Sequence, residues 1–212
     1  MAGDVLMPIK AVVFDFGGVL YHQPDMKMAR RLQAMLGLQN DPLISAMLAS
    51  PNDSQFVTDI MVGKIAEQEL WTMLARRMKV NTDLLNRLRQ SLMSRKRLNK
   101  ELADYLGGLR PRYKTAILSN AGSDARRTFT EIYGLHRVVD EMIISAEEQV
   151  AKPDCRIYQI TVDRLGIAPG EIVFLDDVIE NVDAARQLGI HAVQYQNNAQ
   201  AIADVQSYLR EG

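Results

Sequence analysis

Residues 9–20 read IKAVVFDFGGVL, a mostly apolar run that is followed by one acidic residue, Asp15, and then by the adjacent glycines Gly17 and Gly18. A short apolar run that is rich in Val and Phe and ends at glycine predicts a strand buried on both faces. Asp15 then lies at the carboxyl end of this strand, the edge at which open α/β sheets bind ligands. The glycines allow backbone N–H groups to approach a bound anion, although a buried strand followed by an ordinary turn has similar letters.

Composition limits the function classes. The chain has 212 residues, of which 47% are hydrophobic and 24% charged, and this length is sufficient for a full core and a small second domain. A net charge of −1 gives no reason to expect nucleic acid or an anionic membrane as a partner. Cys155 is the only cysteine, which excludes a disulfide framework and a thiolate zinc site. Without a basic, apolar leader or a long apolar segment, the expected location is the cytoplasm.

The segment 21–96 has a helical pattern throughout, with no strand pattern to interrupt it. Helices alone must then bury one another, which predicts a small helical bundle inserted after the first strand. Five amphipathic stretches are predicted, and they carry these apolar residues: Met28, Leu32, Met35 and Leu36; Leu43, Ile44, Met47 and Leu48; Phe56, Val57, Ile60 and Met61; Leu70, Trp71, Leu74 and Met78; and Leu84, Leu85, Leu88 and Leu92.

Strand and helix patterns alternate after residue 97. The expected strands cover residues 114–118, 142–145, 172–175 and 191–195, and an amphipathic helix lies between each pair. Such alternation predicts right-handed βαβ units and a parallel sheet. We therefore expect a three-layer, Rossmann-like α/β core formed by residues 1–20 and 97–212, with an all-helical cap at 21–96.

Polar residues follow the predicted strands at one edge of this sheet. They are Asp15, Ser119-Asn120, Lys152 and Asp176-Asp177. Asp15 and Asp177 can supply carboxylate oxygens to Mg²⁺, which takes few protein ligands and leaves room for phosphate oxygens. The Lys152 ammonium and the Ser119 hydroxyl can balance and hydrogen-bond the charge of a phosphoryl group.

With these residues in this order, the chain resembles the haloacid dehalogenase superfamily, in its phosphatase-like branch with a helical C1-type cap after the first strand. The resemblance covers most of the chain. It rests on four short motifs: Asp15-Phe16-Gly17-Gly18-Val19; Ser119-Asn120; Lys152 within Ala151-Lys152-Pro153-Asp154; and Asp176-Asp177 followed by Asn181.

The resemblance implies a Mg²⁺-dependent hydrolase of a small phosphorylated metabolite. Asp15 would attack phosphorus and form an aspartyl-phosphate that water hydrolyses. Asp15, Asp177 and the backbone carbonyl of Gly17 would hold the metal, with Asp176 as a direct or water-bridged ligand.

The resemblance also implies how the phosphoryl group is bound. Ser119, the backbone around Asn120, and Lys152 would hold the transferring group. Asn181 would brace the metal-binding loop, although an Asn on a helix surface is an equally simple interpretation.

One position departs from the family pattern. Phosphatases of the family usually carry a second Asp two residues after the nucleophile as general acid and base, and here that position is Gly17. The loss of such a group costs roughly 10²- to 10⁴-fold in rate. Three explanations are open: the protein is slow or serves only for binding; its leaving group departs readily, as from an anomeric or acyl phosphate; or His22, Asp25 or a cap residue supplies the proton.

A halide-releasing dehalogenase is the second enzyme hypothesis. Carbon–halogen cleavage requires an Asp nucleophile but no general acid, which agrees with Gly17. The pair Asp176-Asp177 argues against this hypothesis, because two carboxylates beside Asp15 would repel an anionic halo-acid unless a cation lies among them.

Overall fold

A computed structural model describes residues 7–22, 55–81 and 97–211, together with residues 34, 40 and 83. The predicted helices around Met28, Leu43 and Leu84 lie outside the described residues, as does Asp25. Among the helices within the described ranges, none combines the length and the apolar character that crossing a membrane requires.

Parallel strands form a five-stranded sheet in the order β3-β2-β1-β4-β5. The strands are β1 (Ala11–Phe14), β2 (Lys114–Ser119), β3 (Glu141–Ile144), β4 (Ile172–Asp176) and β5 (His191–Gln194). At the centre, Phe14 of β1 is in register with Ile117 of β2 and with Leu175 of β4. The predicted α/β class with a parallel sheet is confirmed.

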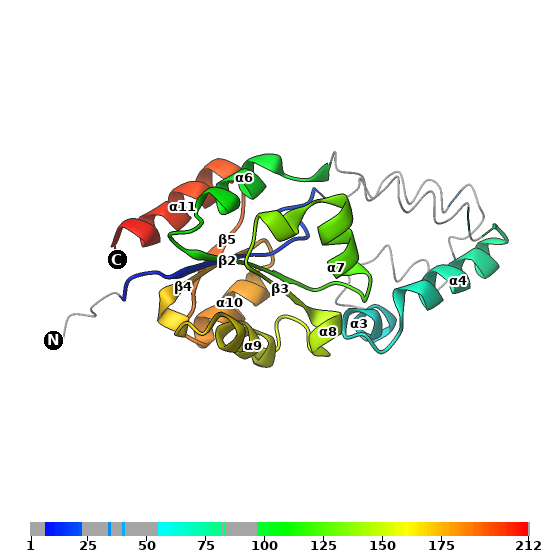
Figure 1. The fold of residues 1–212 in the computed structure, drawn as a ribbon. Coiled ribbons are helices and arrows are strands. Elements are labelled where there is room, and N and C mark those ends of the chain that lie inside the picture. Colours follow the sequence, from blue (N-terminus) through cyan, green and yellow to red (C-terminus); the bar gives the residue numbers. More distant parts are fainter. Residues whose placement is uncertain are drawn as a thin grey trace.

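Helices cover both faces of the sheet (Figure 1). One face carries α6 (Lys100–Gly108) and α11 (Asn198–Glu211), and the other carries α9 (Cys155–Leu165) and α10 (Ile179–Gln187). Because side chains alternate along a strand, Val12 and Phe14 join the first hydrophobic cluster while Ala11 and Val13 join the second. Both faces of β1 are therefore buried, as its apolar run predicts.

The connections after β2 and β3 differ from the prediction. The helix expected through residues 125–132 consists of a short α7 (Ala125–Arg127) and a single π-helical turn, η3 (Thr128–Ile132), followed by η4 (Leu135–Arg137). Ser145, expected as the end of a strand, instead begins α8 (Ser145–Glu148). Its hydroxyl accepts a hydrogen bond from the backbone N–H of Ala121 (2.9 Å), which links the loop after β2 to α8.

Two of the predicted helices of the 21–96 segment are described, α3 (Gln55–Met61) and α4 (Glu67–Met78). Helix α3 lies beside α8 at one end of the core, and α4 lies farther from it (Figure 1). The two helices bury a separate cluster, Ile60, Leu70, Leu74 and Ala75. The backbone N–H of Glu67 donates to the hydroxyl of Ser123, at 3.3 Å, so the start of α4 contacts the loop after β2.

The chain leaves the core and returns to it at one place. Tyr21 pairs with Leu98 in an antiparallel bridge, and the N–H of His22 donates to the carbonyl of Arg97 at 2.8 Å. The N–H of Asn99 donates to the carbonyl of Leu20 at 2.9 Å. Residues on either side of the segment 23–96 are therefore neighbours, and the five strands of the described sheet come from outside that segment.

Candidate active site

Three carboxylates meet where the neighbouring strands β1 and β4 end. The N–H of Asp15 donates to the carbonyl of Leu175 at 2.8 Å, which continues the pairing of the two strands beyond Phe14. Asp15, Asp176 and Asp177 each offer one carboxylate oxygen, and these oxygens lie within 4.8 Å of one another. The structure thus brings together the acidic residues that the sequence places at this edge.

The ammonium of Lys152 lies among these carboxylates. Its side chain is 1% exposed, and Nζ donates to Oδ1 of Asp15 (2.6 Å), Oδ2 of Asp176 (2.6 Å) and the carbonyl of Leu118 (3.0 Å). An ammonium has three N–H groups, and all three have protein acceptors here. Lys152 therefore orients the predicted nucleophile in addition to contributing positive charge beside it.

The side chain of Asn120 holds the backbone of Lys152. Its Nδ2 donates to the carbonyl of Lys152 at 2.8 Å, and its Oδ1 accepts from the N–H of Lys152 at 2.8 Å. The sequence predicts only that the backbone around Asn120 faces a phosphoryl group. This paired contact joins the loops after β2 and α8, and it cannot be inferred from letters that lie 32 residues apart.

Asp176 is fixed by its own loop and by α10. Its Oδ1 accepts the N–H of Val178 at 2.8 Å, and both carboxylate oxygens accept from Nδ2 of Asn181 at 3.1 Å. Asn181 is 7% exposed, and its carbonyl accepts from the hydroxyl of Tyr158 at 2.8 Å. Asn181 is thus a buried brace of the acidic loop and not a surface residue.

Gly18 makes room for Asp177. Its φ is +87°, and a Cβ on Gly18 would lie 2.2 Å from Oδ2 of Asp177. Its N–H donates to the carbonyl of Tyr21 at 2.9 Å, which closes the turn that follows Asp15. Glycine is therefore required at this position both by the backbone conformation and by the adjacent carboxylate.

Burial and repulsion dominate the electrostatics of the site. Burial, with added repulsion from Asp176 and Asp177, raises the pKa of Asp15 to about 7, although Lys152 opposes this shift. Burial alone would lower the pKa of Lys152, but Asp15 and Asp176 outweigh it and raise the pKa. Three carboxylates and one ammonium carry a net charge of −2 when ionised, and such an oxygen-rich set suits a hard divalent cation.

The remaining predicted residues border a cavity or lie apart. Gly17, Ser119 and Asn120 line a cavity of about 320 Å³ that extends toward α3 and α4. His22 is exposed, and its N–H is directed to Arg97 as described above.

Asn99 supports the site, and the sequence analysis does not identify it. Nδ2 of Asn99 donates to the carbonyl of Val19 (3.0 Å) in the loop after β1 and to Oδ1 of Asn198 (2.8 Å). An Asn just before an amphipathic helix predicts an N-cap, and Oδ1 of Asn99 does accept from the N–H of Leu102 at 3.4 Å. The contact with the loop after β1 depends on tertiary structure.

Comparison with known proteins agrees with this geometry. A family model described as haloacid dehalogenase-like hydrolase matches residues 9–189. (S)-2-haloacid dehalogenase 1 of Pseudomonas sp. is 32% identical over 120 residues, which is 53% of this chain and 50% of that protein. Phosphatase MT3486 of Mycobacterium tuberculosis is 27% identical over 189 residues, which is 88% of this chain and 87% of that protein.

The fold is also that of a solved structure. A family enzyme of Bacteroides thetaiotaomicron, crystallised with magnesium and inorganic phosphate, has a TM-score of 0.73 at 19% identity and covers 92% of this chain and 98% of its own. Matches to three curated relatives above 30% identity cover only 6%, 36% and 50% of those proteins. Because the family model matches most of the residues, from the first strand to the end of α10, the chain belongs to the haloacid dehalogenase-like hydrolase family.

Proposed function

We propose that the chain is a Mg²⁺-dependent phosphatase of small phosphomonoesters, with Asp15 as nucleophile. The observation that carries the proposal is the buried cluster in which Lys152 bridges Asp15 and Asp176 while Asp177 lies within 4.8 Å of both carboxylates. A nucleophilic carboxylate, a fixed ammonium and a divalent-cation site are the elements that phosphoryl transfer through an aspartyl ester requires.

In the proposed reaction, a carboxylate oxygen of Asp15 attacks phosphorus, and the bond between phosphorus and the ester oxygen breaks. The ester oxygen leaves with the electron pair and takes up a proton from solvent water. Water then attacks phosphorus, which releases inorganic phosphate and restores the carboxylate of Asp15. The Ser119 hydroxyl and the backbone N–H groups around Asn120 donate to the phosphoryl oxygens, and Lys152 holds the Asp15 carboxylate in position.

The donor set fits magnesium. Asp15, Asp177 and the carbonyl of Gly17 would hold the ion, with Asp176 as a direct or water-bridged ligand. When bound, the ion offsets the negative charge of the carboxylates and of the phosphoryl group. The similar fold that binds magnesium and inorganic phosphate supports this choice.

The proposed domains are a core of residues 1–20 and 97–212 and a helical cap of residues 21–96. Support comes from the pairing of Tyr21 with Leu98 and from the separate apolar cluster of α3 and α4. The cap would close over Asp15 and protect the phosphorylated carboxylate from water until hydrolysis.

The test is a screen of phosphomonoesters with and without Mg²⁺. We expect hydrolysis that chelation removes and that Asp15→Asn and Asp177→Ala abolish, whereas Asp104→Asn, at an exposed position on α6, retains it. With Gly17 in place of the usual acid, aryl phosphates should react much faster than alkyl phosphates. Activity that survives chelation, or that is retained in Asp15→Asn, would refute the proposal.

Haloacid dehalogenase activity is the second candidate, since Gly17 lacks the acid that phosphatases use and one relative of 32% identity is a dehalogenase. Asp15 would displace halide from carbon, and water would hydrolyse the resulting ester. Release of chloride from (S)-2-chloropropionate in the presence of a chelator, without any phosphatase activity, would favour this function. A folded protein that is inactive in both assays but binds Mg²⁺ and phosphate would be a binding member of the family.

A further inference from the structure

The cavity beside the cluster has an apolar interior. Its lining includes Gly17, two residues after Asp15, and Ser119 and Asn120 at the end of β2, and its volume is about 320 Å³. The remaining wall is mostly hydrocarbon and comes from both parts of the chain. Its apolar members include Phe16 and Tyr21 after β1, Phe129 of η3, and Val57, Ile60, Met61 and Leu70 of α3 and α4.

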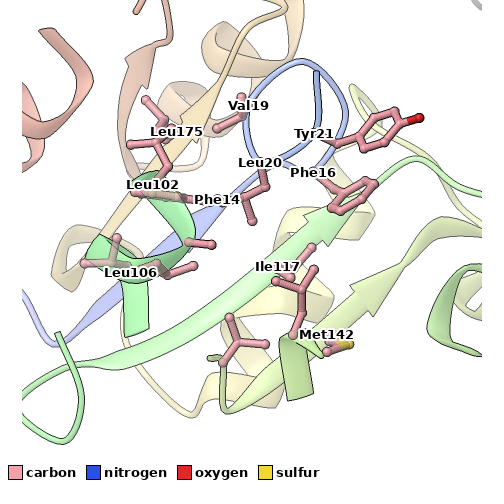
Figure 2. Close-up of a cluster of buried hydrophobic side chains, with 14 of the residues drawn as sticks. Phe14, Phe16, Val19, Leu20, Tyr21, Leu102, Leu106, Ile117, Met142 and Leu175 are labelled. Atoms are coloured by element: carbon pink, nitrogen blue, oxygen red, sulfur yellow. The ribbon is translucent and has the colours of Figure 1, made fainter. Parts of the chain in front are cut away.

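Aromatic contacts fix the core side of this wall. The ring centroids of Phe16 and Phe129 lie 4.1 Å apart, and those of Phe16 and Tyr21 lie 5.3 Å apart. Figure 2 shows the Phe16 and Tyr21 rings next to one another after β1. Gly17 and Ser119, which would flank the phosphoryl group, line the same cavity as Phe16, so we expect the leaving group to lie beside these rings. Cavities of this size hold small ligands.

Glu67 is the one charged side chain among the described residues that line the cavity. Its Oε1 accepts from Nε1 of Trp71 at 3.2 Å, and a Cβ on Gly122 would lie 3.1 Å from its Oε2. The carboxylate thus lies over the loop that follows Ser119. A second anionic group on a substrate would meet this negative charge at a half-buried position of the wall.

We infer that the leaving group of the substrate is an apolar alcohol or phenol without a second negative charge, bound in the cavity between the loop after β1 and helices α3 and α4. This inference rests on the proposed phosphatase function and narrows its substrate class. Apolar surface that enters the cavity binds by the hydrophobic effect, and Glu67 excludes carboxylates and additional phosphates.

Ethyl, butyl and hexyl phosphate form the first test, because their leaving groups are almost equally basic and differ mainly in apolar area. We expect kcat/KM with Mg²⁺ to rise about fourfold for each methylene that enters the cavity. A flat series, or a preference for glycerol and sugar phosphates over hexyl phosphate, would overturn the inference and leave the phosphatase function in place.

Val57→Thr keeps the shape of a lining residue and adds a hydroxyl. It should therefore reduce the increase of kcat/KM with alkyl chain length. Val80→Thr is the matched control, since Val80 follows α4 and does not line the cavity. If kcat/KM increases equally with alkyl chain length in the two variants, the assignment of this cavity is contradicted. If Val57→Thr fails to fold, Met61→Gln, at a half-buried lining position, replaces it.

Glu67→Gln tests the exclusion of anions. Wild-type protein should have a higher kcat/KM for hexyl phosphate than for the phosphate ester of 6-hydroxyhexanoate. Glu67→Gln should reduce the ratio of these two kcat/KM values by about tenfold, because that is the size of the charge repulsion expected at an intermediate dielectric constant. Glu69→Gln, an exposed position on the same helix, should leave the ratio unchanged. If this ratio is unchanged in Glu67→Gln, the inference that Glu67 excludes anionic substrates is wrong.

Binding of alkylphosphonates separates the two hypotheses. These compounds are not hydrolysed, and calorimetry with Mg²⁺ should give a hexylphosphonate affinity well above that of ethylphosphonate. If no ester is hydrolysed but this difference is found, the phosphatase function fails and the apolar cavity stands. If hydrolysis occurs but the two phosphonates bind equally, the phosphatase function stands and the inferred apolar leaving-group site fails.

Discussion

Gly18 is the residue at which backbone conformation and site chemistry depend on each other most directly. Gly18→Ala adds a side chain at a φ of +87°, which costs about 1–2 kcal/mol, and its Cβ displaces the Asp177 carboxylate. We expect Mg²⁺ affinity to fall by about 10- to 100-fold, as for other residues that orient a metal ligand. Isothermal calorimetry measures the affinity, and urea unfolding measures the stability.

Gly134→Ala provides the control for this substitution. Gly134 also has a positive φ, +71°, but a Cβ there would meet nothing within 4 Å. Gly134→Ala should therefore lose about as much stability as Gly18→Ala but keep the Mg²⁺ affinity of the wild-type protein. Equal affinity losses in the two variants would show that general destabilisation, and not the displaced carboxylate, weakens metal binding.

Asp15 couples metal binding to pH. Burial raises the pKa of this carboxyl to about 7, so the metal-free fold retains a proton that the unfolded chain, with an ordinary pKa of 3.8, has already released. The stability of the metal-free protein therefore decreases as pH rises from about 4 to 7. Because only the ionised carboxylate binds a metal, Mg²⁺ affinity should increase, by about tenfold between pH 6 and pH 8.

Calorimetry in two buffers with different ionisation enthalpies tests this coupling. At pH 6, Mg²⁺ binding should release close to one proton, and at pH 8 much less than one. An affinity that does not change between these two pH values would contradict a proton on Asp15 in the metal-free site.

At the scale of the elements, Asn99 connects the start of α6, the loop after β1 and the start of α11. Asn99→Ala removes the cap of α6 and leaves the carbonyl of Val19 without this donor. We expect a loss of about 2 kcal/mol in the free energy of unfolding, with urea denaturation as the measurement.

The contact between Asn99 and Asn198 can be measured separately. A double-mutant cycle of Asn99→Ala and Asn198→Ala should give a coupling energy of at least about 0.5 kcal/mol, because each side chain donates to the other. Additive effects would indicate that the two side chains act independently and that capping accounts for the whole loss.

Local patterns predict the elements that depend on local properties. The apolar run before Asp15 and the amphipathic stripes of α3 and α4 were predicted correctly, because burial of one face leaves a period in the sequence. The parallel order of strands also places the acidic residues of β1 and β4 at one edge. The π-helical turn after Arg127 and the start of α8 at Ser145 were not predicted, because packing and hydrogen bonds to distant residues determine them.

The same limit applies to the site. The residue types predict a carboxylate cluster with Lys152 beside it, but not that its ammonium uses all its N–H groups on protein oxygens. Nor do they predict the two hydrogen bonds between Asn120 and the backbone of Lys152. Such contacts form between loops that are far apart in the chain, and the sequence of one loop does not indicate which other loop it will contact.

At the scale of the whole molecule, α3 and α4 lie against the core. The N–H of Glu67 donates to the hydroxyl of Ser123, and Gly63 packs so closely that a Cβ there would lie 2.4 Å from the carbonyl oxygen of Ala146. If the proposed cap closes on the phosphorylated site, Mg²⁺ with beryllium fluoride should slow amide exchange in residues 55–81. Hydrogen-exchange mass spectrometry tests this, with α11, on the opposite side of the core, as the internal control (Figure 1). Unchanged exchange in residues 55–81 would argue against closure.

The central place of β1 in the sheet also affects how the chain acquires its structure. Ala11 pairs with Lys114 and with Ile172, so both neighbours of this strand are synthesised more than a hundred residues after it. Until β4 leaves the ribosome, an apolar strand that ends in the proposed nucleophile has no complete sheet to join. Such a high contact order favours slow folding, with an exposed intermediate that chaperones can bind. Assembly of the carboxylate cluster, the proposed catalytic centre, is therefore expected late in biosynthesis, when β4 inserts beside β1.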